Sequence, residues 1–143
     1  SRVRENDSCS NEETLLTQFS NCCKNNDEEN NNLFYLILEL LFLQFQNYNN
    51  FHNIIGKITN EQSKYCHVNE SLSLLINYPF IFQKNPNLIG FIVKYLQNTY
   101  FNSQNSITVY QRKIFKQLLG IVITFYIKFE ILIKLNFVKK IND

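Results

Sequence analysis

The fold of this chain is decided by residues 33–48, which read LFYLILELLFLQFQNY. Glu39 is the only charged residue among them, so apolar side chains occupy nearly every side of the stretch. Its sixteen residues are too many for one buried strand, and this length favours a helix. A helix that is apolar all round has to be covered by neighbours on most sides. The stretch therefore predicts a central helix flanked by other elements.

The composition supplies suitable neighbours. The 143 residues are 45% hydrophobic, with 13 Phe and 8 Tyr, but include only three Gly and two Pro. Hairpin turns need Gly, Asn or Pro at set positions. Although 22 Asn could serve some turns, the apolar runs are long and spaced by threes and fours. We therefore expect an all-α fold.

Further helices are predicted on both sides of the central one. Ser10 or Asn11, ahead of Glu13, resembles a helix start before the apolar residues at 15–23. Pro79 should kink or end a second buried helix at residues 71–83, because proline removes a backbone donor. The other expected helices are a short amphipathic one at 51–58, one at 88–96 after Pro86, a long one at 107–126 and a shorter one at 128–141.

The chain aligns with itself, which indicates an internal repeat. The aligned positions, at shifts of 34 and 78 residues, are the Leu-Leu pairs 40–41, 74–75 and 118–119, and the apolar pairs 54–55, 88–89 and 132–133. The unit would be a long apolar helix, a short break and a shorter amphipathic helix. We expect residues 1–11 to be a disordered or extended lead, and residues 12–143 to be a single all-helical domain of about three units.

Three stretches carry this pattern: LELLFLQFQNYNNFHNIIGKI, LSLLINYPFIFQKNPNLIGFIVKYL and FKQLLGIVITFYIKFEILIKLNFVKKI. The pattern resembles armadillo and HEAT repeats. That resemblance implies a short right-handed stack of helical repeats acting as a non-catalytic scaffold for a peptide or partner protein. Two apolar ends would remain exposed, so flanking repeats or self-association are expected. Because the chain does not begin with Met, we expect a fragment or a processed product.

In such a stack the shorter second helices line a concave side. Asn side chains there can hydrogen-bond an extended peptide, and Lys favours acidic partners. The candidate partner-binding residues on that side are His52, Asn53, Lys57, Asn87, Lys94, Lys134, Asn136 and Lys139.

A second resemblance leaves an alternative open. The stretches LLTQFSNCC and LIGFIVK, the latter followed by SITVY, look like segments of viral Bcl-type apoptosis inhibitors. Those proteins are compact helical bundles, and the resemblance implies a groove that holds an amphipathic death-motif helix of a partner.

The net charge of +2 is unevenly spread. Residues 1–39 carry three basic and eight acidic side chains, whereas residues 40–143 carry eleven basic and four acidic ones. No dense Lys/Arg stripe suited to phosphate tracking is present, so we do not expect a nucleic-acid partner. The most apolar stretch, residues 118–138, is interrupted by Lys128, Glu130 and Lys134, so no membrane span is expected.

No motif indicates chemistry. The four cysteines, Cys9, Cys22, Cys23 and Cys66, match no zinc framework, and Cys66 and His67 are adjacent and point apart. Free thiols indicate a reducing compartment, and we expect an intracellular, cytoplasmic protein. The three glycines are isolated and form no phosphate loop. We therefore expect no catalytic residues, metal or cofactor.

Overall fold

A computed structural model describes residues 11–25, 31–65, 67–75, 77, 80–102 and 106–142, apart from the side chains of residues 25, 31 and 128–142. The described residues form the helices α2 (Asn11–Asn25), α3 (Asn31–Gln44), α4 (Tyr48–Asn60), α5 (Val68–Leu75), α6 (Phe80–Lys84), α7 (Leu88–Thr99) and α8 (Val109–Asn142). They contain no strand, and the prediction of an all-α fold is confirmed. Residues 1–10 of the predicted lead lie outside the described residues.

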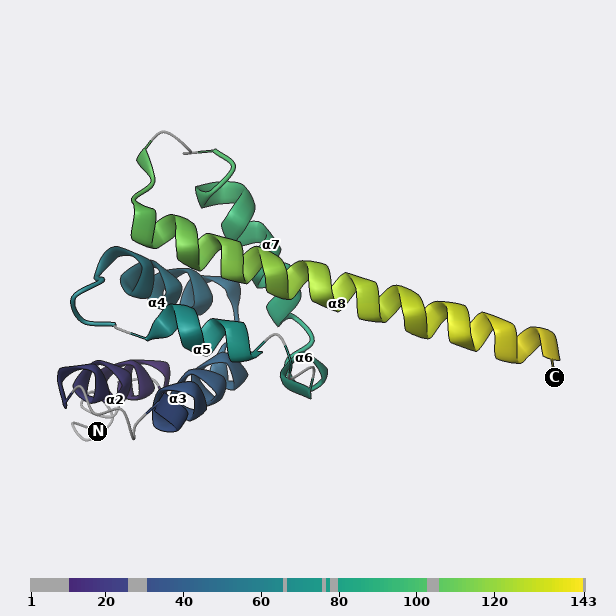
Figure 1. Ribbon diagram of the computed structural model, residues 1–143, viewed down its shortest axis with the longest axis horizontal. Coiled ribbons are helices and arrows are strands. Elements are labelled where there is room, and N and C mark those ends of the chain that lie inside the picture. Colours follow the sequence, from purple (N-terminus) through teal and green to yellow (C-terminus); the bar gives the residue numbers. More distant parts are fainter. Residues whose placement is uncertain are drawn as a thin grey trace, which may run out of the picture.

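The helices pack in layers (Figure 1). Helix α3 packs against α2 on one side and α5 on the other, and α5 in turn packs against α8. Helix α7 also packs against α8, while α4 contacts α2, α7 and α8. Elements that are distant in the sequence, such as α5 and α8, therefore share the core with sequence neighbours.

Aromatic rings fill the centre of this core. The fully buried ring of Phe51 on α4 lies 5.2 Å from the ring of Phe45 and 5.8 Å from the ring of Tyr95, both edge to face. Edge-to-face contact is favoured because the positive edge of one ring meets the negative face of the other. A second contact of this kind joins Phe19 of α2 to Phe34 of α3. Phe45, Phe51 and Tyr95 form an aromatic cluster that joins the end of α3 to α4 and α7, and the Phe19–Phe34 pair joins α2 to α3.

Two asparagines define the break after α3. The predicted helix at 33–48 ends at Gln44, because Asn47 adopts an extended backbone and its Oδ1 accepts a hydrogen bond from the Asn50 N–H at 2.9 Å, capping α4. Buried Asn85 supports the end of α3 from the other side. Its Nδ2 donates to the carbonyls of Phe42 at 3.1 Å and Phe45 at 2.9 Å. Carbonyls at a helix C-terminus lack intrahelical donors, and the Asn85 amide supplies the missing hydrogen bonds.

The predicted helix at 71–83 is two helices, α5 and α6. Helix α5 ends at Leu75, three residues before the expected end near Tyr78, and α6 begins at Phe80, directly after Pro79. A proline can precede a helix but cannot continue one, which agrees with this division. Tyr78 and Pro79 themselves lie outside the described residues.

The predicted division of the C-terminal region into two helices is wrong. Helix α8 runs without a break over 34 residues, from Val109 to Asn142. In the self-alignment the capping residue Asn47 corresponds to Phe125, which has no side-chain oxygen to cap a new helix. With no proline between residues 109 and 142, and no asparagine at the position that corresponds to Asn47, the helix continues. Its C-terminal half runs out beyond the other helices as a straight extension (Figure 1).

Candidate partner-binding surface

One face of α3 carries exposed leucines. The side of α3 that contains Phe34, Leu38 and Leu41 is buried, as expected for a core helix. On the outward side, Leu33 is 42% exposed, Leu36 is 50% exposed and Leu40 is 47% exposed. Spacings of three and four residues place these side chains one above the other. We call these three residues the leucine stripe.

The stripe corrects the expectation that this helix is covered on most sides. Helices α2, α5 and α6 contact α3, but no described helix lies over the leucine stripe. An outward helix face normally carries polar side chains. Here Glu39, half-buried, is the only charged residue of the whole helix. Single exposed leucines are ordinary, whereas three in register on one helix form an apolar patch.

A second exposed apolar group lies on α8. Ile123, Tyr126 and Ile127 are 49%, 51% and 54% exposed, and their spacing of three and four residues places them on one side of the helix. They directly precede residues 128–142, where α8 leaves the other helices. The apolar surface of α8 therefore increases toward the part of the helix that has no neighbour in Figure 1.

Two of the predicted site residues meet around Tyr48. The exposed His52 ring lies 5.7 Å from the Tyr48 ring and 5.7 Å from the Tyr95 ring. From α7, Lys94 Nζ lies 4.3 Å from the centre of the Tyr48 ring, in a cation–π contact. Asn53 is also exposed on α4. The structure therefore places both His52 and Lys94 against the ring of Tyr48, a residue that the prediction did not include.

The remaining predicted residues lie elsewhere. Lys57 pairs with Glu13 of α2 at 2.8 Å, because five residues along a helix turn its side chain about 140° from His52. Asn87 is exposed at the start of α7 and makes no side-chain cap. Lys134, Asn136 and Lys139 belong to the end of α8, whose side chains lie outside the described part. Because α8 is continuous, it carries these three positions away from α4 and α7 (Figure 1).

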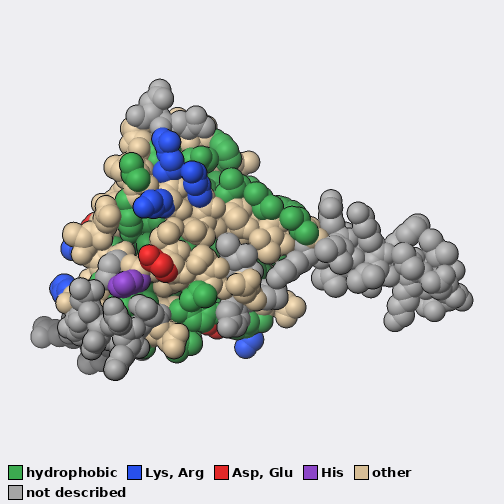
Figure 2. Space-filling model, in the orientation of Figure 1, with side chains coloured by type: hydrophobic (Ala, Val, Ile, Leu, Met, Phe, Trp, Pro, Cys, Tyr) green, Lys and Arg blue, Asp and Glu red, His purple; other side chains and the backbone are tan. Residues whose placement is uncertain are grey.

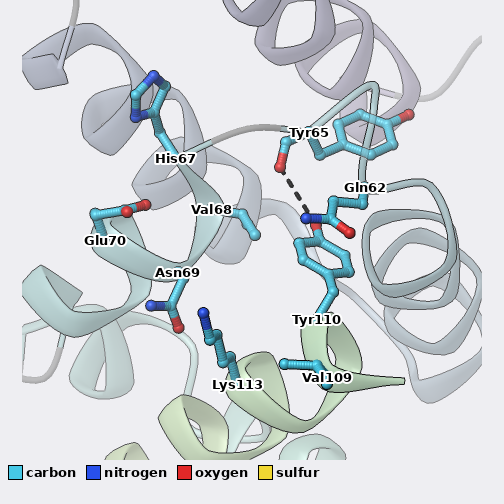
Figure 3. A pocket seen from close by; sticks show the side chains of 9 residues that line it. All are labelled: Gln62, Tyr65, His67, Val68, Asn69, Glu70, Val109, Tyr110 and Lys113. Atoms are coloured by element: carbon cyan, nitrogen blue, oxygen red, sulfur yellow. Dashed lines mark hydrogen bonds between the residues drawn. The ribbon is translucent and has the colours of Figure 1, made fainter. Parts of the chain in front are cut away.

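A pocket of about 350 Å³ opens between α5 and the start of α8 (Figure 3). It lies on the face shown in Figure 2, where basic side chains gather over the first turns of α8. Its lining residues are Gln62, Tyr65, His67, Val68, Asn69, Glu70, Val109, Tyr110 and Lys113.

The polar groups of this pocket are mostly structural. The Tyr110 hydroxyl donates to the Ile58 carbonyl at 2.8 Å and lies 3.3 Å from the Tyr65 carbonyl, which ties α8 to the end of α4 and the following loop (Figure 3). Burial, and then the negative charges of Glu61 and Glu13, raise the pKa of Tyr65, so its phenol stays neutral. The Tyr110 hydroxyl is therefore engaged with backbone carbonyls.

Two further features of the pocket concern Asn69 and His67. Asn69 and Lys113 point toward each other across it (Figure 3), and within the described residues the Asn69 Oδ1 is buried without a hydrogen-bond partner. His67, at the entrance to α5, has a left-handed backbone with φ of 62°, which is uncommon outside glycine. Its ring packs on Phe34, with centroids 4.7 Å apart, so contact with the core holds this conformation in place.

A smaller pocket of about 260 Å³ lies between α4, α7 and the start of α8, with His52, Tyr95 and Asn98 among its lining residues. The Tyr95 hydroxyl is 3.1 Å from Thr59 Oγ1. Burial raises the pKa of Tyr95 despite this hydrogen bond. The Asn98 amide donates to the Tyr48 hydroxyl at 3.3 Å, so both tyrosines hold α4 against α7.

Among the described residues, no group of three or more His, Cys, Asp or Glu side chains could hold a metal ion. Cys22 of α2 is a free thiol, and the neighbouring Cys23 is buried. Cys9 and Cys66 lie outside the described residues. In that same part of the chain, no helix is long and apolar enough to cross a membrane.

Comparisons with protein-family models, with curated proteins and with solved structures found no match to this chain. The armadillo/HEAT and Bcl-type resemblances therefore stay predictions.

Proposed function

We propose that this chain is a non-catalytic scaffold that binds an apolar helical segment of a partner protein on the leucine stripe of α3. The observation that carries the proposal is the exposure of Leu33, Leu36 and Leu40 on a helix whose outward side has hardly any polar residues. Covering what remains exposed of each leucine would contribute about 1 kcal/mol. The same spacing on a partner helix would give the interdigitated contact that helical recognition uses.

We propose further that the helices form a short repeat stack of the armadillo/HEAT kind. Helices α3, α5 and α8 pack side by side in that order, and α4 contacts α7. This arrangement supports one row of first helices and one row of second helices. The third unit would contribute α8 alone, since the expected second helix is part of it. A stack of this kind ends on open helix faces, which favours association with another protein.

Other aspects of the proposal follow from the side chains. The Tyr110 hydroxyl of the larger pocket holds backbone carbonyls, which supports binding rather than catalysis. The exposed basic residues Arg112, Lys113 and Lys116 cover only the first turns of α8, so we propose a protein partner and no nucleic acid. The free thiol of Cys22 supports a location inside the cell, in the cytoplasm.

Peptide titration tests the binding surface. Fluorescent helical peptides with leucines at positions i, i+3 and i+7 should bind the chain in the micromolar range, about −8 kcal/mol, by anisotropy. The Leu36→Glu variant should lose this binding, whereas Val109→Glu, a change at an exposed apolar residue outside the stripe, should retain it. Equal binding to both variants would refute the stripe as the binding surface.

The same assay separates the Bcl-type alternative. The chain would be titrated with a panel of amphipathic death-motif helices. Binding at micromolar or tighter affinity that persists in the Leu36→Glu variant would support a binding groove outside the leucine stripe, and an apoptosis-regulating function instead.

A further inference from the structure

The end of α8 is rich in apolar residues, and no other described helix lies beside it (Figure 1). Residues 128–142, the C-terminal segment, include eight apolar residues: Phe129, Ile131, Leu132, Ile133, Leu135, Phe137, Val138 and Ile141. At about 100° per residue these positions are spread round the helix. Isolated helices of this length are marginal in water, and one that is apolar all round requires cover. The backbone of the segment nevertheless extends past every other helix (Figure 1).

The leucine stripe has the length and charge to provide that cover. Helix α3 has 14 residues and the C-terminal segment has 15, or about 21 Å and 22 Å of helix. The C-terminal segment carries four Lys and one Glu, whereas the only charged residue of α3 is the acidic Glu39, which directly precedes Leu40 of the stripe. Opposite charges at the edges of an apolar contact favour this pairing and suppress the pairing of like surfaces.

The two surfaces of one chain do not meet. Helix α8 is continuous from Val109 to Asn142, and it leads the C-terminal segment away from α3 (Figure 1). Bending the segment back would break a helix that has no proline and no capping residue at Phe125. A second copy of the chain can supply the missing surface without any such break.

We infer that the C-terminal segment of one copy packs on the leucine stripe of a second copy, and that reciprocal exchange of the two segments closes a two-fold dimer. The inference rests on the proposed function, because it takes the stripe to be a protein-binding surface and names its partner. Reciprocal exchange buries both apolar surfaces on both copies and leaves no end open for further growth.

Complementation between two variants of the full chain tests this pairing by analytical ultracentrifugation. The stripe variant, Leu36→Glu with Leu40→Glu, keeps the C-terminal segment. The segment variant, Leu132→Glu with Leu135→Glu, keeps the stripe. The native chain should be dimeric at about 10 µM, and each variant alone should dissociate at least about 100-fold more readily. An equimolar mixture of the two should form a heterodimer, because one intact stripe then meets one intact segment.

Controls make each outcome decisive. Circular dichroism should show that both variants keep the helix content and cooperative unfolding of α2–α7, and Val109→Glu should remain dimeric. The native dimer should weaken as salt rises, because the edge charges are screened.

A monomeric native chain at this concentration, or a mixture that stays monomeric, would overturn the inference. If the native chain is monomeric but the stripe still binds helical peptides, the self-pairing fails and the proposed function stands; if neither binds, both fail. Binding of the native chain to vesicles with anionic lipid, lost in the segment variant alone, would assign the segment to a membrane surface and also overturn the inference.

Discussion

The side chain of Asn85 offers a sharp test of how α3 is held in place. Its amide nitrogen donates to the carbonyls of Phe42 and Phe45, and the residue is only 8% exposed. Replacing it by Ala removes both donors and leaves two carbonyls at the end of α3 without these bonds. An orphaned buried acceptor costs about 1–3 kcal/mol, and a cavity that admits water returns part of it. We expect Asn85→Ala to lower the free energy of unfolding by about 2–3 kcal/mol.

Urea unfolding followed by circular dichroism measures this change. The midpoint should fall by about 1 M with an unchanged slope, and the melting temperature should fall by about 8 °C. Asn87→Ala is the matched control, because the same residue type two positions later is exposed and makes no side-chain cap. It should change stability by less than about 0.5 kcal/mol.

Asn85→Asp sharpens the test. The carboxylate keeps the shape of the amide but presents only acceptors to two carbonyls, so the loss should be at least as large as for Ala. If Asn85→Ala and Asn87→Ala were equally stable, the end of α3 would not depend on this side chain, and the reasoning would be refuted.

Three further predictions concern packing and titration. Gly90→Ala should raise the free energy of unfolding by about 0.5–1 kcal/mol in the same urea assay, because an added methyl group meets nothing within 4 Å on this helix; a loss of stability would contradict the packing of α7. Phe51→Ala should cost about 3–5 kcal/mol by removing the centre of the aromatic cluster, while exposed Asn53→Ala should be near neutral; similar effects of the two would contradict the core assignment. The raised pKa values of Tyr65 and Tyr95 predict a contribution to the free energy of unfolding that is fully present below pH 10 and falls above it, because the folded chain keeps protons that the unfolded chain releases. Absorbance titration of the phenolates should place the pKa values of both tyrosines above 10. A free energy of unfolding that does not change above pH 10 would contradict this prediction.

Helix content and most helix positions could be predicted from the sequence. Apolar residues at helical spacing indicated α2, α3, α4 and α7, because this periodicity can be recognised within a short stretch of sequence. The continuity of α8 was not predicted, because self-alignment compared apolar positions and ignored the capping residue. Asn47 begins a new helix and Phe125, at the corresponding position, does not.

The features that depend on distant neighbours could not be predicted. Asn85 reads as an ordinary turn residue, and its partners lie 40 and 43 residues earlier in the chain. The apolar sequence of α3 indicates that the helix must be covered by neighbours. Which of its sides remains exposed depends on the packing of α2, α5 and α6, and the sequence does not show this packing. His52 and Lys94 were both expected at the surface, yet the aromatic contact that joins them required the placement of Tyr48 between α4 and α7.

Position-specific cross-linking tests most directly whether the leucine stripe is covered by another copy. A photoreactive residue at position 36 would be introduced into a mixture of isotopically light and heavy copies of the full chain, and the cross-linked peptides would be identified by mass spectrometry. The account predicts cross-links that join light to heavy copies and connect position 36 to residues 128–142. Cross-links confined to single copies, or cross-links between copies that never include residues 128–142, would contradict it.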